Sequence, residues 1–119
     1  MRALLASAAV AVLLAACGGS SVAQPAGSTK VTMTEYSFNP AAITVPNGKV
    51  VFYVVNSGTM SHDLVIHDSS GSVVARTELI SAGDSVVLTV NTIAAGSYKI
   101  VCDQPGHEAS GMKGTLTAT

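Results

Sequence analysis

One stretch of this chain decides how the rest of it must fold: Val101-Cys102-Asp103-Gln104-Pro105-Gly106-His107-Glu108-Ala109-Ser110-Gly111-Met112. It contains a thiol, an imidazole and a thioether at the spacing Cys-x4-His-x4-Met. Soft sulfur ligands combined with an imidazole suit copper better than calcium, magnesium or a structural zinc ion. A third strong ligand has to come from elsewhere, and His62 is the candidate. The sequence therefore predicts a copper site formed by His62, Cys102, His107 and Met112.

The segment between the cysteine and the methionine has the residues of a tight turn. In a continuing strand Cys102 and His107 would lie on opposite faces, because they are five residues apart. Gln104-Pro105-Gly106-His107 can reverse the chain, since proline presets the second position of a type II turn and glycine tolerates a positive φ at the third. Gly111 gives Met112 similar freedom. We expect this loop to fold back over its own cysteine.

The chain after residue 29 shows the pattern of short strands. Runs rich in Val, Thr and Ile are separated by turn residues such as Pro46-Asn47-Gly48. The expected strands cover residues 31–36, 42–45, 50–55, 62–66, 72–80, 86–90, 98–102 and 114–119. Strands at intervals of about ten residues are typical of an antiparallel sandwich or barrel with Greek-key connections. We expect one all-β domain of about seven to eight strands.

The alternation of side chains along two of these strands predicts where the ligands point. His62 begins its strand and shares a face with Leu64 and Ile66, whereas Cys102 ends its strand and shares a face with Ile100. If the apolar faces form the core, both ligands point inward. The start of one strand and the end of its antiparallel neighbour can lie at the same end of the sandwich, where a shared metal site could form.

The N-terminal region has the composition of an export signal and should not take part in the fold. Arg2 supplies a positive start, and residues 3–16 form an apolar run that is too short for a membrane span of about 20 residues. The run ends in Leu14-Ala-Ala-Cys17, which resembles the lipobox of bacterial lipoproteins. We expect residues 1–16 to be a signal peptide, residues 17–29 to be a flexible tether that starts at lipidated Cys17, and residues 30–119 to be the domain. An ordinary cleaved signal is the alternative.

Charge and cysteine content limit the possible functions. The net charge is −1, and the chain has no basic cluster with interleaved aromatic residues, so we expect no nucleic-acid partner. The two cysteines could form a disulfide in an exported protein. If Cys17 is acylated, however, Cys102 is left as a single thiol that must be buried or bound to a metal.

The stretch Cys102 to Met112, followed by Lys113-Gly-Thr-Leu116, resembles the ligand loop of the cupredoxins, the small blue-copper proteins. The resemblance extends over about residues 30–119 and includes Phe38-Asn-Pro40, Pro46-Asn-Gly48 and Ser61-His-Asp-Leu64. It implies a cupredoxin-like fold in which His62, Cys102 and His107 are the equatorial ligands of one copper ion and Met112 is the weak axial ligand. The family's carbonyl oxygen before the first histidine would belong to Ser61.

Two residues beside the ligands depart from the family pattern. Asp63 stands where the family often has Asn, whose side chain ties the ligand loops together, and Asp103 stands where a hydroxyl residue often follows the cysteine. We expect both to place acid near the site without binding the metal, and to lower the reduction potential by favouring Cu(II).

We expect the protein to carry single electrons outside the cytoplasm and not to be an enzyme. The edge of His107 would be the electron port, within a patch formed by Met60, Pro105, Gly106, Ala109 and Gly111. Its partners would be a redox donor and an acceptor, and it would be a monomer anchored by lipid to a bacterial membrane, facing the periplasm or the cell exterior. Copper delivery or storage is the main alternative; a metal-free sandwich and a small copper oxidoreductase are two others.

Overall fold

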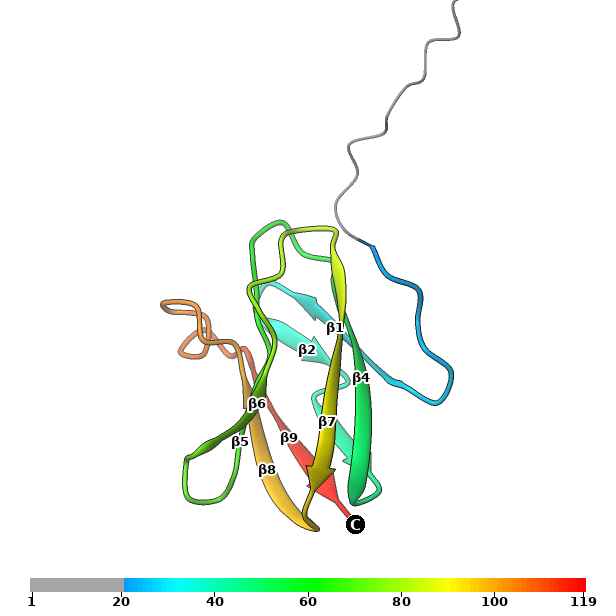
Figure 1. Ribbon diagram of the computed structural model, residues 1–119. Helices are drawn as coiled ribbons and strands as arrows, with labels where there is room; N and C mark the ends of the chain where they lie inside the picture. Colours follow the sequence, from blue (N-terminus) through cyan, green and yellow to red (C-terminus); the bar gives the residue numbers. More distant parts are fainter. Residues whose placement is uncertain (1–20) are drawn as a thin grey trace, which may run out of the picture.

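The computed structural model describes residues 21–119, so the predicted signal peptide (1–16) and the predicted lipidation of Cys17 lie outside the described residues. Nine strands occur in this part of the chain (Figure 1). They are β1 (Thr29–Thr34), β2 (Ser37–Asn39), β3 (Ala42–Val45), β4 (Gly48–Asn56), β5 (Val65–His67), β6 (Val73–Arg76), β7 (Ser85–Ile93), β8 (Gly96–Val101) and β9 (Lys113–Ala118).

The strands form two sheets that pack face to face. One sheet has the order β2-β1-β4-β7 and the other the order β3-β9-β8-β5-β6. The predicted all-β sandwich is confirmed, with β2 as a short additional strand that the residue pattern did not indicate. Among residues 21–119 there is no helix with the length and apolar character that a membrane crossing requires.

The strand pattern predicted an antiparallel sandwich, but the two sheets are mixed. β1 pairs parallel with β4, and β3 pairs parallel with β9. The cause is the path of the chain, because β2 belongs to the first sheet and β3 to the second. The chain therefore crosses between the sheets before it returns as β4, which then runs in the same direction as its neighbour β1.

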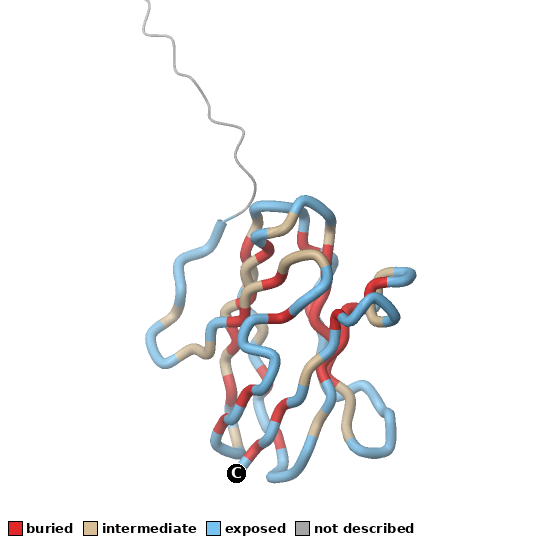
Figure 2. Tube along the Cα trace, turned by 180° about the vertical axis from the view of Figure 1, so that it is seen from behind, coloured by how far each residue is buried: buried red, intermediate tan, exposed pale blue. Residues whose placement is uncertain are grey.

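The core lies between the two sheets, where the buried segments of the chain face one another (Figure 2). In β4, Val50, Phe52 and Val54 are buried while the alternate residues are only partly covered, as expected for a strand with one face on the core. Burial of each such side chain contributes about 1.5–3 kcal/mol. Met33 on β1 belongs to the same core, which fixes the strands that end near the candidate site.

Val22, in the predicted tether, is hydrogen-bonded to the sandwich. The backbone amide of Val22 donates to Oγ of Ser85 at 3.0 Å, and the hydroxyl of Tyr53 donates to the Val22 carbonyl at 2.9 Å. Ser85 is the first residue of β7, and Tyr53 lies on the neighbouring strand β4. The chain before β1 is therefore held against the outer face of the first sheet.

Candidate metal centre

Two histidines and one cysteine come together in the interior at one end of the sandwich. One potential ligand atom from each of His62, Cys102 and His107 lies within 4.8 Å of the other two. The two Nδ1 atoms are 3.1 Å apart, and Cys102 Sγ lies 3.8 Å from Nδ1 of His62 and 3.4 Å from Nδ1 of His107. The exposed fractions are 0% for His62, 1% for Cys102 and 5% for His107. Three donor atoms thus face one buried point.

His62 is held by a short contact outside the regular strands. The sequence predicted that it begins a strand, but β5 begins only at Val65. His62 instead pairs with Ile80 in an isolated bridge, with N to O distances of 3.0 and 2.8 Å. Residues 62–66 are all buried, so the expected alternation of faces is absent.

The predicted turn forms in the loop between β8 and β9. The His107 amide donates to the Gln104 carbonyl at 3.0 Å, and Gly106 has a φ of +79°, as the third position of a type II turn requires. Figure 1 shows this loop in orange where it leaves β8. The Cys102 amide donates to the Met112 carbonyl at 3.1 Å, and the Met112 amide to the His107 carbonyl at 3.0 Å. The loop therefore closes over its cysteine and buries the Met112 side chain.

Asn56, a buried residue at the end of β4, fixes the segment before His62. Its Nδ2 donates to the carbonyls of Met60 and Ile80, both at 2.8 Å. Its Oδ1 accepts from the Gly58 amide at 3.0 Å. A side chain that is fully hydrogen-bonded in the interior holds these backbone segments in one arrangement. Ser61, the predicted carbonyl donor, is half-buried directly after this segment.

Sequence reasoning missed Glu35, which lies in the turn between β1 and β2. Its Oε1 lies 3.1 Å from Nε2 of His62 and accepts from the amides of Thr59 and Met60 at 2.8 and 2.7 Å. The pKa of Glu35 is lowered to about 2, first because of the Met60 amide and then because of the Thr59 amide and His62, against an opposing effect of desolvation. Nothing local in the sequence indicated this contact, because it joins residues 27 positions apart.

The two predicted acids beside the ligands have different environments. Asp63 is buried, and its Oδ1 accepts from the Asp103 amide next to the cysteine, at 2.6 Å. Asp103 is exposed. Arg76 on β6, which sequence reasoning also missed, lies 3.3 Å from Asp63 Oδ2 and 3.2 Å from Asp103 Oδ2. Asp63 thus ties the two ligand segments together, and Arg76 offsets part of the charge that we expected to lower the reduction potential.

An exposed apolar group surrounds the edge of His107. The predicted port residues Pro105, Gly106, Ala109 and Gly111 are exposed, and Met60 is 42% exposed. Tyr36, which the sequence did not indicate, is 38% exposed and packs edge-on against the His107 ring with centroids 5.1 Å apart. Its hydroxyl lies 3.8 Å from Sδ of Met60. Tyr36 and Met60 therefore lie beside the buried ligand at the surface.

The donor set fits a copper ion. Two imidazole nitrogens and one thiolate, with a thioether in the same loop, match the ligands of blue-copper centres. Burial raises the pKa of the Cys102 thiol, so a cation that replaces its proton is what would stabilise the thiolate here. The His62–Cys102–His107 cluster could therefore hold one copper ion.

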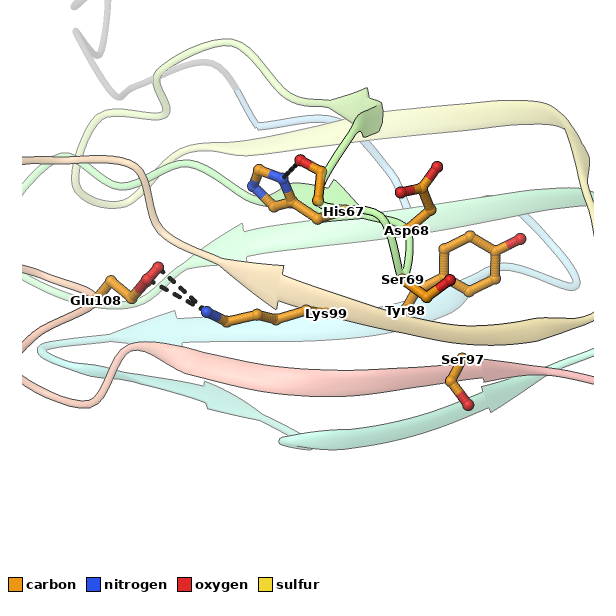
Figure 3. Close-up of a pocket in the computed structure, with 8 residues that line it drawn as sticks. His67, Asp68, Ser69, Ser97, Tyr98, Lys99 and Glu108 are labelled. Carbon is orange, nitrogen blue, oxygen red and sulfur yellow. Dashed lines mark hydrogen bonds and ion pairs between the residues drawn. The ribbon is translucent and has the colours of Figure 1, made fainter.

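A surface cavity is lined by none of the three clustered residues. It has a volume of about 460 Å³ and lies between strand β8 and the end of β5, where His67 is the last strand residue and Asp68 begins the turn to β6 (Figure 3). His67 Nδ1 is 3.1 Å from the Gly71 carbonyl, and Lys99 pairs with Glu108 at 3.4 Å. Figure 3 shows these polar groups satisfied by neighbouring residues. An exposed ion pair such as Lys99–Glu108 contributes little to stability.

The amino-acid sequence is similar to those of three known proteins. Auracyanin-B of Chloroflexus aurantiacus is 49% identical over 45 residues, which cover 38% of this chain and 19% of the relative. Plastocyanin of Scenedesmus fuscus is 31% identical over 87 residues, with 67% of this chain and 84% of the relative covered. The copper-resistant cuproprotein CopI of Rubrivivax gelatinosus is 28% identical over 106 residues, with 75% and 64% covered. The chain thus spans less than two thirds of auracyanin-B and CopI.

The comparison with solved structures agrees with the sequence matches. A solved structure of auracyanin B superimposes with a TM-score of 0.72 and 27% identity, covering 86% of this chain and 96% of that one. Residues 5–118 match the family described as a cupredoxin-like domain. With this match over most of its length, the chain belongs to the cupredoxin-like family.

Proposed function

We propose that this protein is a single-electron carrier with one mononuclear blue-copper (type 1) site. The observation that carries the proposal is the buried cluster of two imidazole nitrogens and one thiol sulfur within 4.8 Å of one another. Copper would supply the one-electron change between Cu(I) and Cu(II). The chain supplies donors that the Asn56 side chain and the Asp63–Asp103 contact hold in place. A site that rearranges little when an electron arrives or leaves is the physical requirement for fast transfer.

We assign the weaker ligand positions to two further residues. Met112 would be the axial ligand, which is supported by its full burial and by the backbone bonds that join it to Cys102 and His107. A distant thioether is a typical fourth ligand of such sites and tunes their reduction potential. The Ser61 carbonyl would be a further weak contact, because it directly precedes His62.

We propose that electrons enter and leave beside His107. This placement is supported by the exposed residues Met60, Pro105, Gly106 and Ala109 around a ligand that is itself 5% exposed. Tyr36 extends the same surface. Ala109→Asp should slow electron exchange with a redox partner while the protein keeps its copper. Unchanged exchange in stopped-flow measurements would place the port elsewhere.

The colour of the copper-loaded protein tests the proposed function. Protein with added Cu(II) should turn intensely blue through thiolate-to-copper charge transfer and should bleach reversibly with a mild reductant. Cys102→Ser should abolish the blue band, whereas Met112→Gln should keep the copper and lower the reduction potential. Survival of the band in Cys102→Ser would contradict the ligand assignment.

Copper delivery or storage is the second candidate function, and the relative named copper-resistant cuproprotein CopI supports it. A colourless protein that retains one copper ion and exchanges it readily with a chelator would favour this function. A blue, redox-active protein that holds its copper against the same chelator would favour electron transfer.

We propose that the protein acts outside the cytoplasm as a lipid-anchored monomer, with a redox donor and an acceptor as partners, and that it is not an enzyme. The support is the signal-like residues 1–16 followed by Cys17, together with the family membership. Cys17→Ser should release the domain from the membrane fraction of a bacterial host. Retention of that variant in the membrane fraction would contradict the anchor.

A further inference from the structure

A carboxylate contacts the ring nitrogen of His62 that points away from Cys102 and His107. Nδ1 of His62 faces Cys102 and His107, whereas Nε2 on the other side of the ring lies 3.1 Å from Oε1 of Glu35. The His62 side chain is fully buried, and that of Glu35 is 25% exposed. This is a direct contact between a charged group and a predicted copper ligand, on the side away from the metal.

The contact assigns the tautomer of His62. A carboxylate can only accept a hydrogen bond, so the proton of a neutral His62 ring must be on Nε2. The other nitrogen, Nδ1, is then left with a free lone pair directed toward Cys102 and His107. The tautomer that can bind a metal at Nδ1 is therefore the one that Glu35 selects.

The position of Glu35 is itself fixed. Its Oε1 accepts from two successive backbone amides, those of Thr59 and Met60, at 2.8 and 2.7 Å. Gly58 leaves the space that the carboxylate occupies, because a Cβ on this residue would lie 2.5 Å from Oε1 and 2.9 Å from Oε2. The carboxylate thus has a built cradle, formed by the same segment that leads to His62.

We propose that Glu35 is a positioning residue of the copper site, which orients His62 through Nε2, makes Nδ1 a stronger donor and stabilises Cu(II) relative to Cu(I). A hydrogen bond from a ligand imidazole to a carboxylate raises the basicity of the ligand nitrogen. The negative charge also favours the more highly charged metal ion. Asp63 does not provide an equal effect, because it binds backbone and Arg76 instead of a ligand ring.

The inference concerns copper binding and does not depend on the protein being an electron carrier. A delivery or storage protein would show the same dependence of copper affinity on Glu35. Loss of electron exchange would refute the proposed function alone, and the measurements below would still test Glu35.

The test compares three variants of the full chain with a matched control. Glu35→Gln keeps an oxygen acceptor but removes the charge, Glu35→Ala removes both, and Gly58→Ala displaces the carboxylate without changing it. Glu78→Gln removes one negative charge from an exposed residue of the same chain. Cu(I) and Cu(II) affinities are measured by chelator competition, the reduction potential by voltammetry, and the His62 tautomer by ¹⁵N NMR of the protein without copper.

Glu35→Ala should weaken Cu(II) binding about 10–100-fold, the usual effect of removing such a partner. Glu35→Gln should weaken Cu(II) binding about tenfold relative to Cu(I), which corresponds to a potential about 59 mV higher for one electron. Gly58→Ala should also weaken Cu(II) binding and raise the reduction potential. Glu78→Gln should have the Cu(II) affinity and the potential of the native protein.

Two results would overturn the proposal. The first is that Glu35→Gln and Gly58→Ala have the same reduction potential and the same Cu(II) affinity as the control Glu78→Gln. The other is a native His62 with its proton on Nδ1 in the NMR spectrum. If Glu35→Ala does not fold, the comparison of Glu35→Gln and Gly58→Ala with Glu78→Gln still tests the proposal, because these variants keep a polar side chain at residue 35.

Discussion

Glu35 and Asp63 are two carboxylates beside the same candidate copper site, and the structure uses them differently. Both accept hydrogen bonds from backbone amides, Glu35 from Thr59 and Met60 and Asp63 from Asp103. Glu35 touches the ring of His62, whereas Asp63 holds the backbone beside Cys102 and has Arg76 at 3.3 Å. Two equal charges beside the same candidate site thus have different chemical effects.

The difference lies in what each carboxylate would change if it were removed. Asp63 is buried, joins two segments 40 positions apart and is partly neutralised, so we expect it to act mainly on stability. Glu35 has no cation among the groups that hold it, which are two amides and an imidazole, so we expect it to act mainly on the metal. Three experiments test this division, starting with the one that should have the largest effect.

Asp63→Ala should destabilise the fold by about 1.5–3 kcal/mol, the contribution of a hydrogen bond to a charged group. The Asp103 amide would lose its acceptor, and Arg76 would lose one of its two partners. Urea unfolding of the protein without copper measures the loss. Glu35→Ala is the comparison, and it should be less destabilising; an equal loss in both variants would contradict the division.

Arg76→Met and Asp63→Asn should shift the reduction potential in opposite directions and by small amounts. Arg76→Met leaves Asp63 and Asp103 without their cation, so Cu(II) is favoured and the potential falls. Asp63→Asn keeps an oxygen for the Asp103 amide and removes a charge, so the potential rises. Voltammetry should show each shift to be smaller than that of Glu35→Gln. A larger shift for Asp63→Asn would show that Arg76 does not compensate Asp63.

Asp68 should have the smallest effect on the site, because it is a carboxylate with similar hydrogen bonds that contacts none of the predicted ligands. Ser70 Oγ donates to it at 2.6 Å and the Ser72 amide at 3.0 Å, and its pKa is lowered, first by the Ser70 side chain. Because the pKa of Asp68 is lower in the folded protein than in the unfolded chain, its stabilising contribution is fully present above the unfolded-state pKa and is lost as pH falls through the folded-state pKa.

The thermal midpoint of Asp68→Asn should therefore be lower than that of the native protein at pH 6, and the difference should disappear in acid. The potential should be the same in both proteins. A difference in midpoint that persists or grows as the pH falls would contradict the role of the Asp68 carboxylate.

The sequence predicted the features that depend on local residue chemistry. The all-β sandwich follows from short apolar runs separated by turns, and the loop after Cys102 follows from the proline and glycine of its turn, which the His107–Gln104 hydrogen bond confirms. The structure brings His62 to Cys102 and His107, as the strand faces indicated, although His62 lies outside β5.

The features that the sequence did not predict depend on pairing between distant segments. Glu35 reaches His62 because β1 lies parallel to β4, with Met33 opposite Asn56, and the residue pattern indicated only antiparallel neighbours. Arg76 reaches Asp63 because β6 pairs with β5 at the edge of the other sheet. Neither register is determined by the composition of a single strand, so side-chain contacts across these pairs could not be derived from the sequence.

The contact of Val22 with Tyr53 and Ser85 limits how far the domain could move from a membrane. From Cys17 to Thr29, an extended chain of twelve residues would reach about 40 Å, but from Cys17 to Val22 five residues reach only about 17 Å. Val22 is bound where β7 begins and near the end of β4, the end of the sandwich that carries Asn56 and the ligand segments. If Cys17 is lipidated as proposed, the site would stay close to the bilayer, within reach of partners embedded in the same membrane.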